Sequence, residues 1–123
     1  MNSTILAVVS DYNTRTRLYH LASELDLSID FCETIGNAMG RLKFYNYSAI
    51  IVDFDSVSIK PDEVVEGLRK VALGIPILAV INRTQARSAD QFQISQIIAL
   101  ITKPIDAKTF SEAMQKLAVV SNV

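Results

Sequence analysis

Short apolar runs recur along this chain, and most of them carry no polar residue at alternate positions. A strand with one face in water alternates apolar and polar side chains, whereas a strand buried on both faces is a continuous apolar run. The run at 28–32 does alternate, which is typical of an edge strand. We predict strands at 4–9, 28–32, 48–53, 75–81 and 97–102.

Amphipathic helical patterns separate these runs. Each has one apolar stripe, with spacings of three and four residues, that would pack on a sheet. The stripes are Leu18, Leu21 and Leu25; Ile35, Met39 and Leu42; Val64, Leu68 and Val71; and Phe110, Met114 and Leu117. The segment 84–96 has a weaker stripe, and we expect a short, loosely held helix there. Strands alternating with helices at this spacing predict an α/β fold with a doubly wound, five-stranded parallel sheet.

Length and composition narrow the possible functions. The 123 residues suffice for one domain, which we expect to span residues 1–123. A net charge of -1 without a basic run gives no sign of direct nucleic-acid binding. The single cysteine, Cys32, excludes an internal disulfide bond and a multi-cysteine zinc site. No apolar stretch reaches the roughly 20 residues of a membrane span, and no signal peptide is visible, so we expect a cytoplasmic protein without a membrane partner.

Charged residues follow three of the predicted strands. Asp53 ends the run AIIV, Asp11 comes shortly after the first strand, and Lys103 follows the last. The carboxyl ends of parallel strands lie on one edge of the sheet, where such folds bind ligands. Two carboxylates and an ammonium group there would suit a divalent cation and a phosphoryl group. Asp11, Asp53 and the backbone carbonyl of Asp55 are the candidate Mg²⁺ ligands, and Lys103 would hold the phosphoryl group.

Simpler roles are possible for the same residues. Asp53 could be an ordinary strand-end residue, and Lys103 could be a solvated loop residue. Asp11 could cap the first helix, with or without binding a metal. Asp106 is a plausible cap for the last helix, and Phe44, Tyr45 and Tyr47 are expected to cover the third strand.

Four sequence pieces occur in an order that resembles the receiver domain of two-component response regulators. They are ILAVVSD, AIIVDFD, LRKVALGIPILAV, and the pair KP before a final amphipathic helix, and the resemblance covers residues 5–117. It implies a flavodoxin-like (βα)5 fold with strand order 2-1-3-4-5 and a signalling domain that is not an enzyme. It also implies that a histidine kinase or phosphotransfer protein phosphorylates Asp53 with Mg²⁺ present. The surface of the fourth helix, fifth strand and fifth helix would then bind a downstream protein or a second copy of the chain.

Three of the positions at which the chain departs from this family pattern affect the metal site and the switch residues. Ser10 replaces the first of two acids after strand one, so we expect a weakened Mg²⁺ site. Ile81, or Asn82 if the alignment shifts by one residue, replaces a hydroxyl residue that follows the phosphate. Leu100 replaces the aromatic switch residue. These losses favour an alternative function, a pseudo-receiver that binds proteins without being phosphorylated.

Two further hypotheses concern the rim of the site. Asp55 and Arg83 would both border it, and we expect them to pair with each other, or Arg83 to contact the phosphate.

A flavin or nucleotide binder shares this architecture, but the loop 10–16 has no glycine with which its backbone could wrap a phosphate. A hydrolase is disfavoured because no Ser–His or Cys–His pair stands at the strand ends.

Overall fold

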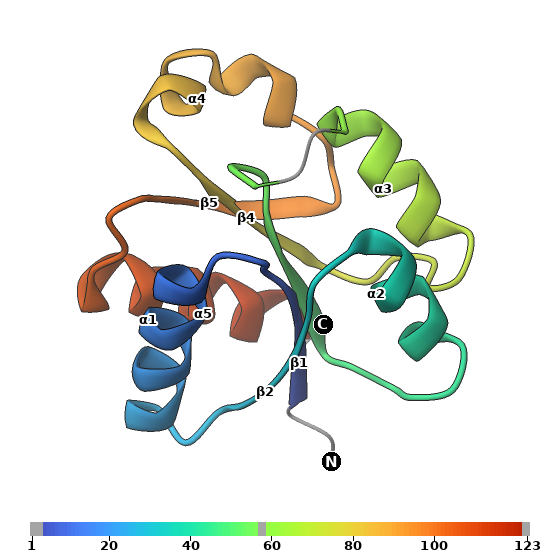
Figure 1. The fold of residues 1–123 in the computed structure, drawn as a ribbon, viewed down its shortest axis with the longest axis horizontal. Helices are drawn as coiled ribbons and strands as arrows, with labels where there is room; N and C mark the ends of the chain where they lie inside the picture. The colour runs from blue at the N-terminus through green and yellow to red at the C-terminus, as the bar shows by residue number, and fades with distance from the viewer. Residues whose placement is uncertain (1–3, 57–58, 122–123) are drawn as a thin grey trace.

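The computed structural model describes residues 4–56 and 59–121. Its strands form one parallel sheet in the order β2-β1-β3-β4-β5, with helices on both faces (Figure 1). The elements are β1 Thr4–Val8, α1 Tyr12–Glu24, β2 Ser28–Cys32, α2 Ile35–Leu42, β3 Ala49–Asp53, α3 Pro61–Arg69, β4 Ile77–Ile81, α4 Arg83–Arg87, the 3₁₀ helix η1 Ala89–Phe92, β5 Ile97–Thr102 and α5 Ala107–Ser121. The predicted fold class and the strand order 2-1-3-4-5 are confirmed.

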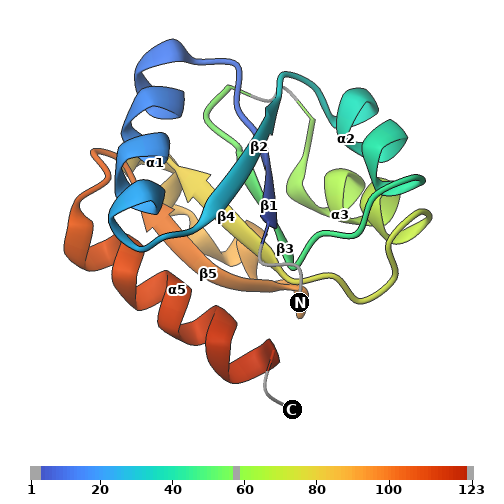
Figure 2. The ribbon, with the colours of Figure 1, turned by 90° about the horizontal axis from the view of Figure 1, so that it is seen from below.

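The central strands are buried on both faces, as their continuous apolar runs predict. Along β1, Ile5 and Ala7 face one core, whereas Leu6 and Val8 face the other. Helices α1 and α5 cover the first face, and α2, α3 and η1 cover the second (Figure 2). Strand β2 lies at the edge of the sheet, as its alternation indicates.

Helix starts follow local capping chemistry. The Asp11 carboxylate accepts a hydrogen bond from the backbone N–H of Thr14 at 2.9 Å, and Asp106 accepts one from that of Thr109 at 2.7 Å. Pro61 stands at the first position of α3, where its missing N–H leaves no helical hydrogen bond unmade. Both predicted caps, at Asp11 and Asp106, are confirmed.

The end of α1 corrects one predicted stripe. Leu25 is 44% exposed and lies just beyond the helix, so it does not extend the Leu18–Leu21 stripe. Asp26 has a φ of 55°, and the N–H groups of Asp26 and Leu27 donate to the carbonyls of Ser23 and Ala22. This is a Schellman turn, which glycine usually closes and which the sequence therefore did not signal.

Other predictions need smaller corrections. Helix α3 ends at Arg69, so Val71 lies in the turn that follows, and β4 begins at Ile77 instead of 75. The segment 84–96 forms two short pieces, α4 and η1, in place of one helix. Phe44 is 81% exposed, and Tyr45 is also exposed, so they do not cover the third strand. Within the described ranges, no helix is long and apolar enough to cross a membrane.

Candidate functional site

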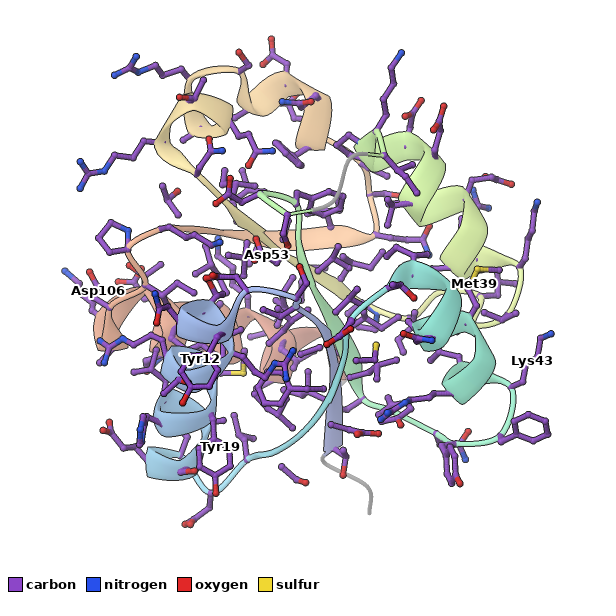
Figure 3. All side chains as sticks on the ribbon, viewed as in Figure 1. Tyr12, Tyr19, Met39, Lys43, Asp53 and Asp106 are labelled. Atoms are coloured by element: carbon purple, nitrogen blue, oxygen red, sulfur yellow. The ribbon has the colours of Figure 1, made fainter. Side chains whose placement is uncertain are left out.

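The candidate site lies at the carboxyl edge of the sheet, where β3 ends at Asp53 (Figure 3). Sheet register places Asp53 beside Val80 of β4, and Val80 beside Ile101 of β5. The chain segments that follow these strands therefore begin at nearly the same level. As a result, Asn82 and Lys103 reach the side of the sheet where Asp53 ends.

Asp53 is fully buried, and its carboxylate has two partners. Its Oδ2 atom lies 3.0 Å from Nζ of Lys103, and its Oδ1 atom accepts a hydrogen bond from the backbone N–H of Asp55 at 3.1 Å. A buried carboxylate is tolerated only when it is paired and hydrogen-bonded, which is the arrangement here. Asp53 is thus held in one orientation by a cation and a backbone donor.

Lys103 bridges two acids. Its ammonium group also lies 3.1 Å from Oδ2 of Asp55, and its backbone N–H donates to the carbonyl of Ile81 at 2.8 Å. The Lys103–Pro104 peptide bond is cis. Burial by itself lowers the pKa of Lys103, but its hydrogen bonds to Asp53 and Asp55 outweigh burial and raise that pKa above its ordinary value. Lys103 is therefore a positioned cation and not a solvated loop residue.

The side chain of Asp55 borders the site, as predicted, but its partners differ from the predicted one. Oδ1 of Asp55 accepts a hydrogen bond from Nδ2 of Asn82 at 2.7 Å, while Oδ2 faces Lys103. The hydrogen bonds from Asn82 and then Lys103 hold the pKa of this carboxyl below its ordinary value. Because Asp55 binds Asn82 and Lys103, the predicted Asp55–Arg83 pair is wrong.

Asn82 links the site to α4. Its Oδ1 atom accepts from the backbone N–H of Gln85 at 2.7 Å, and Oε1 of Gln85 accepts from the backbone N–H of Asn82 at 2.9 Å. Nε2 of Gln85 also donates to the carbonyl of Phe54, directly after β3, at 3.0 Å. A strand followed by Asn-x-x-Gln signals this capping box, and that signal could have identified both residues.

Ile81 and Asn82 point to different environments. Ile81 is 1% exposed and packs in the apolar core under α3 and η1, so it brings no polar group to the site. Asn82, the next residue, supplies an amide N–H donor to Asp55. The polar residue that follows β4 at this site is thus Asn82, one position beyond the strand.

Asp11 combines its helix cap with a place at this edge. Both the hydroxyl and the backbone N–H of Thr14 donate to it, and these hydrogen bonds are the main reason that its pKa lies below the ordinary value. The positive charge of Lys103 lowers the Asp11 pKa further, and the Asp11 charge raises that of Asp55. Asp11, Asp55 and Lys103 are therefore electrostatic neighbours, although Asp11 forms its hydrogen bonds with Thr14.

The residues at this edge supply oxygen ligands of the kind that Mg²⁺ prefers. Among the described residues, no three acidic, histidine or cysteine side chains are grouped closely enough to hold a metal ion by themselves. Mg²⁺ keeps several waters and needs only one or two carboxylates, so Asp11 and Asp53 provide suitable oxygen chemistry. The carboxylates of Asp53 and Asp55 share the single ammonium of Lys103, which leaves an excess of negative charge that would attract a cation.

Two other features lie apart from this edge. Asp30 accepts hydrogen bonds from Arg41 and from the hydroxyl of Tyr47, a network that sequence reasoning missed.

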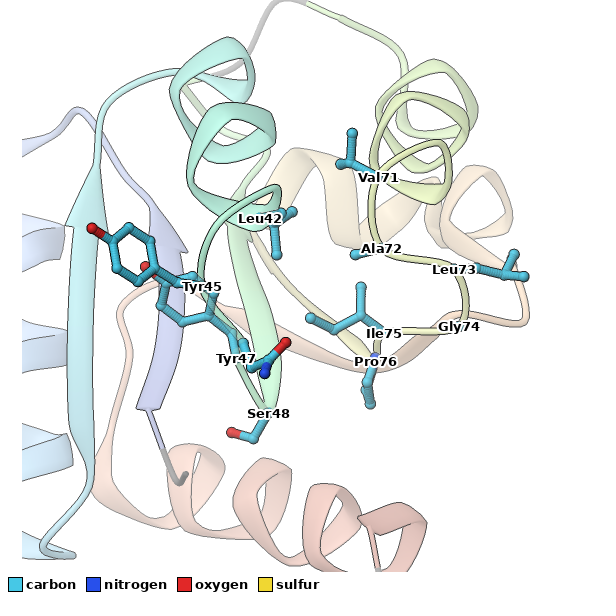
Figure 4. A pocket seen from close by; sticks show the side chains of 11 residues that line it. Leu42, Tyr45, Tyr47, Ser48, Val71, Ala72, Leu73, Gly74, Ile75 and Pro76 are labelled. Carbon is cyan, nitrogen blue, oxygen red and sulfur yellow. The ribbon is translucent and has the colours of Figure 1, made fainter. Parts of the chain in front are cut away.

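A cavity of about 330 Å³ opens between the ends of α2 and α3 and the starts of β3 and β4, with Leu42, Tyr47 and Ile75 in its wall (Figure 4). It lies far from Asp53 along the strands, and none of the described residues that line it is charged.

Comparison with known proteins identifies the fold. No protein-family model matches the chain, and no curated protein is significantly similar in sequence. A CheY-like response regulator receiver domain protein from Methanospirillum hungatei matches with a TM-score of 0.82 and 15% identity, over 99% of this chain and 98% of that chain. The chemotaxis response regulator CheY4 of Vibrio cholerae matches with a TM-score of 0.80 and 17% identity, over 95% and 99%.

A third solved structure, of an adenylate cyclase from Rhodopirellula baltica, matches with a TM-score of 0.79 and 21% identity, over 99% of this chain and 94% of that chain. At these identities, structural similarity establishes the fold. The chain has the fold of CheY-like response regulator receiver domains, which confirms the resemblance predicted from its sequence.

Proposed function

We propose that this chain is a two-component receiver domain that accepts a phosphoryl group on Asp53 from a histidine kinase or phosphotransfer protein. One observation carries the proposal: a fully buried strand-end carboxylate is paired with Lys103 at 3.0 Å, at the edge where this fold binds ligands. Asp55 adds a second acid on the same ammonium, and the positive charge of Lys103 also lowers the pKa of Asp11.

The proposed reaction is a phosphoryl transfer between two protein side chains. A carboxylate oxygen of Asp53 forms a bond to the phosphorus of a phosphohistidine, and the P–N bond breaks. The electron pair of that bond goes to the histidine nitrogen, and because the other ring nitrogen carries a proton, the leaving group is a neutral imidazole. The product is an acyl phosphate on Asp53. The ammonium of Lys103 would bind an oxygen of the transferred group, because fixed cations stabilise the charge on these oxygens.

Mg²⁺ would be held by Asp11, Asp53 and the backbone carbonyl of Asp55. When bound, it would neutralise part of the phosphoryl charge. Ser10 offers a hydroxyl where a further acid would strengthen the site, so we propose weak Mg²⁺ binding. The chain's own contribution is to fix Asp53 and Lys103 in place before the donor arrives.

A second candidate is a pseudo-receiver that binds partner proteins without being phosphorylated. The observation that favours it is access: Asp53 is 0% exposed, and Lys103 is already bound to two carboxylates. In addition, Ile81 is buried and supplies no hydroxyl that could follow a phosphate. Both candidates would act through a downstream protein partner, and they differ in whether Asp53 reacts.

A small phosphodonor distinguishes the two. The chain is incubated with acetyl phosphate and Mg²⁺, and its intact mass is followed with time. We expect one added phosphoryl group in the wild type and none in Asp53→Asn, whose amide oxygen can still accept the Asp55 N–H. Unmodified wild type under conditions that label a known receiver domain would refute phosphoryl transfer and favour the pseudo-receiver.

A further inference from the structure

The Asp55 carboxylate already binds two donors that an anion beside Asp53 would need. Its two oxygens take one hydrogen bond each from Lys103 at 3.1 Å and Asn82 at 2.7 Å. These two donors come from the ends of different strands and converge on the same carboxylate. A phosphoryl group on Asp53 would require the same kind of donors, because it places negative oxygens next to Lys103.

Asp53 itself is closed to solvent in this arrangement. The side chain of Asp53 is 0% exposed and that of Lys103 is 20% exposed, whereas that of Asp55 is 37% exposed. Asp53, the buried acid beside Lys103, is the proposed acceptor. Asp55, the more exposed acid, would compete with incoming anions for the Lys103 ammonium. The negative charge of Asp55 would also repel a phosphodonor that approaches Asp53.

We propose that Asp55 is an internal competitor of the phosphoryl group: its carboxylate holds Lys103 and Asn82 until phosphorylation of Asp53 displaces it. This inference rests on the proposed function and adds a regulation of the same site. If Lys103 and Asn82 are released by Asp55 for only a fraction of the time, the rate of Asp53 phosphorylation falls in proportion to that fraction. Asp55 would therefore slow phosphorylation and favour the unmodified state.

Displacing Asp55 would also affect α4. Asn82 holds Asp55 with its Nδ2 atom and caps α4 with its Oδ1 atom, so one side chain joins the acceptor loop to the helix. Gln85 completes the link through its bond to the carbonyl of Phe54. Through these hydrogen bonds, Asn82 would couple phosphorylation of Asp53 to the position of α4. The buried Ile81 cannot do this because it has no polar group.

Charge removal at Asp55 tests the proposal. Asp55→Asn keeps the shape of the side chain but removes its charge, and Asp55→Ala removes the group that competes. The matched control is Asp26→Asn, because Asp26 is exposed, lies beyond the other end of α1 and has a φ of 55°, which asparagine tolerates well. Each purified protein is labelled with acetyl phosphate and Mg²⁺, and backbone amide spectra are recorded before and after labelling.

We expect both Asp55 variants to be phosphorylated about tenfold faster than the wild type, equivalent to about 1.4 kcal/mol, with Asp26→Asn unchanged. We also expect the amide signals of Gln85 and Ala86 in the unmodified Asp55 variants to move toward their positions in the phosphorylated wild type. Equal or slower labelling of the Asp55 variants, with the wild type still labelled, would refute competition and leave the proposed function intact. Absence of labelling in every variant would refute both.

Discussion

The Nζ atom of Lys103 lies 3.0 Å from Oδ2 of Asp53, whose side chain has no exposure to solvent. These residues are 50 positions apart and leave the ends of different strands, so only the folded sheet brings them together. The pair has two consequences. It stabilises a charge that would otherwise be costly to bury, and it fixes a cation where a phosphoryl group would bind.

Removing the cation should destabilise the fold. Lys103→Met leaves the buried Asp53 carboxylate with its backbone hydrogen bond but without its cation. We expect a loss of about 2–3 kcal/mol in the free energy of unfolding, below the ~3–5 kcal/mol of a fully buried pair, because Lys103 is partly exposed. Urea denaturation at neutral pH measures this loss.

A double-mutant cycle identifies the cause of that loss. With Asp53→Asn, the buried charge is absent, so adding Lys103→Met should cost about 1 kcal/mol or less. Additive effects of the two substitutions would show that Lys103 stabilises the fold through its packing and not through Asp53.

Asp11 should affect Mg²⁺ binding and helix stability separately. Asparagine caps helices about as well as aspartate, whereas alanine does not, so Asp11→Ala should lose about 1 kcal/mol of stability and Asp11→Asn little. Both variants should need about tenfold more Mg²⁺ for half-maximal labelling by acetyl phosphate, since each lacks a carboxylate ligand. If Asp11→Asn responds to Mg²⁺ like the wild type, Asp11 acts only as a helix cap.

The Asp30 network should make stability depend on pH. The hydrogen bond from Arg41, helped by that from Tyr47 and opposed by burial, places the pKa of Asp30 below its ordinary value. The charged carboxylate therefore stabilises the folded state above the unfolded pKa, and this stabilisation is lost as pH falls through the folded pKa. We expect Asp30→Asn to lose about 1 kcal/mol at pH 7, a modest value because Asp30 and Arg41 are partly exposed.

Urea titrations across pH test this expectation. The difference between wild type and Asp30→Asn should shrink as pH falls below about 4, the ordinary pKa of an aspartate. Asp90→Asn, a substitution of an exposed acid in η1, serves as the control. A wild-type advantage that stays constant from pH 7 to pH 3 would exclude the Asp30 carboxylate as its source.

Self-association is expected to involve the surface of α4, β5 and α5. Leu100 on the edge strand β5 is 36% exposed and borders a hollow of about 360 Å³ together with Phe92 and Lys116. Leu100→Asp should weaken any homodimer about tenfold or more in sedimentation experiments, because it would place a charge in an apolar contact. Leu73→Asp is the matched control, since Leu73 is 80% exposed in the loop between α3 and β4 and does not line the hollow that Leu100 borders. Equal association of both variants with the wild type would exclude this surface.

The positions of the strands followed from features that act locally, whereas their order in the sheet was implied by the resemblance to receiver domains. Continuous apolar runs such as AIIV predict a strand buried on both faces, and the residue that ends such a run must lie at the sheet edge. The same strand pattern predicts that Asp53 and Lys103 lie at one edge of the sheet, as they do in the structure. The prediction holds because parallel strands have all their carboxyl ends on one side.

Side-chain direction could not be predicted in the same way. An asparagine after a strand can cap a helix or face the site, and Asn82 does both. Asp55 was expected to meet Arg83, but two nearer donors from other strands bind it instead. The Asp30–Arg41–Tyr47 network joins residues 11 and 17 positions apart, a spacing that matches no helix or strand repeat.

The most direct test of the account is a titration of the ¹⁵N-labelled wild-type chain with beryllofluoride and Mg²⁺, which together imitate a phosphorylated aspartate. We expect saturable shifts in the amide signals of Asp53, Asn82 and Lys103, and no such shifts in Asp53→Asn. An unchanged spectrum at saturating beryllofluoride, in the wild type and in Asp55→Asn alike, would contradict the claim that Asp53 and Lys103 form a phosphoryl-accepting site.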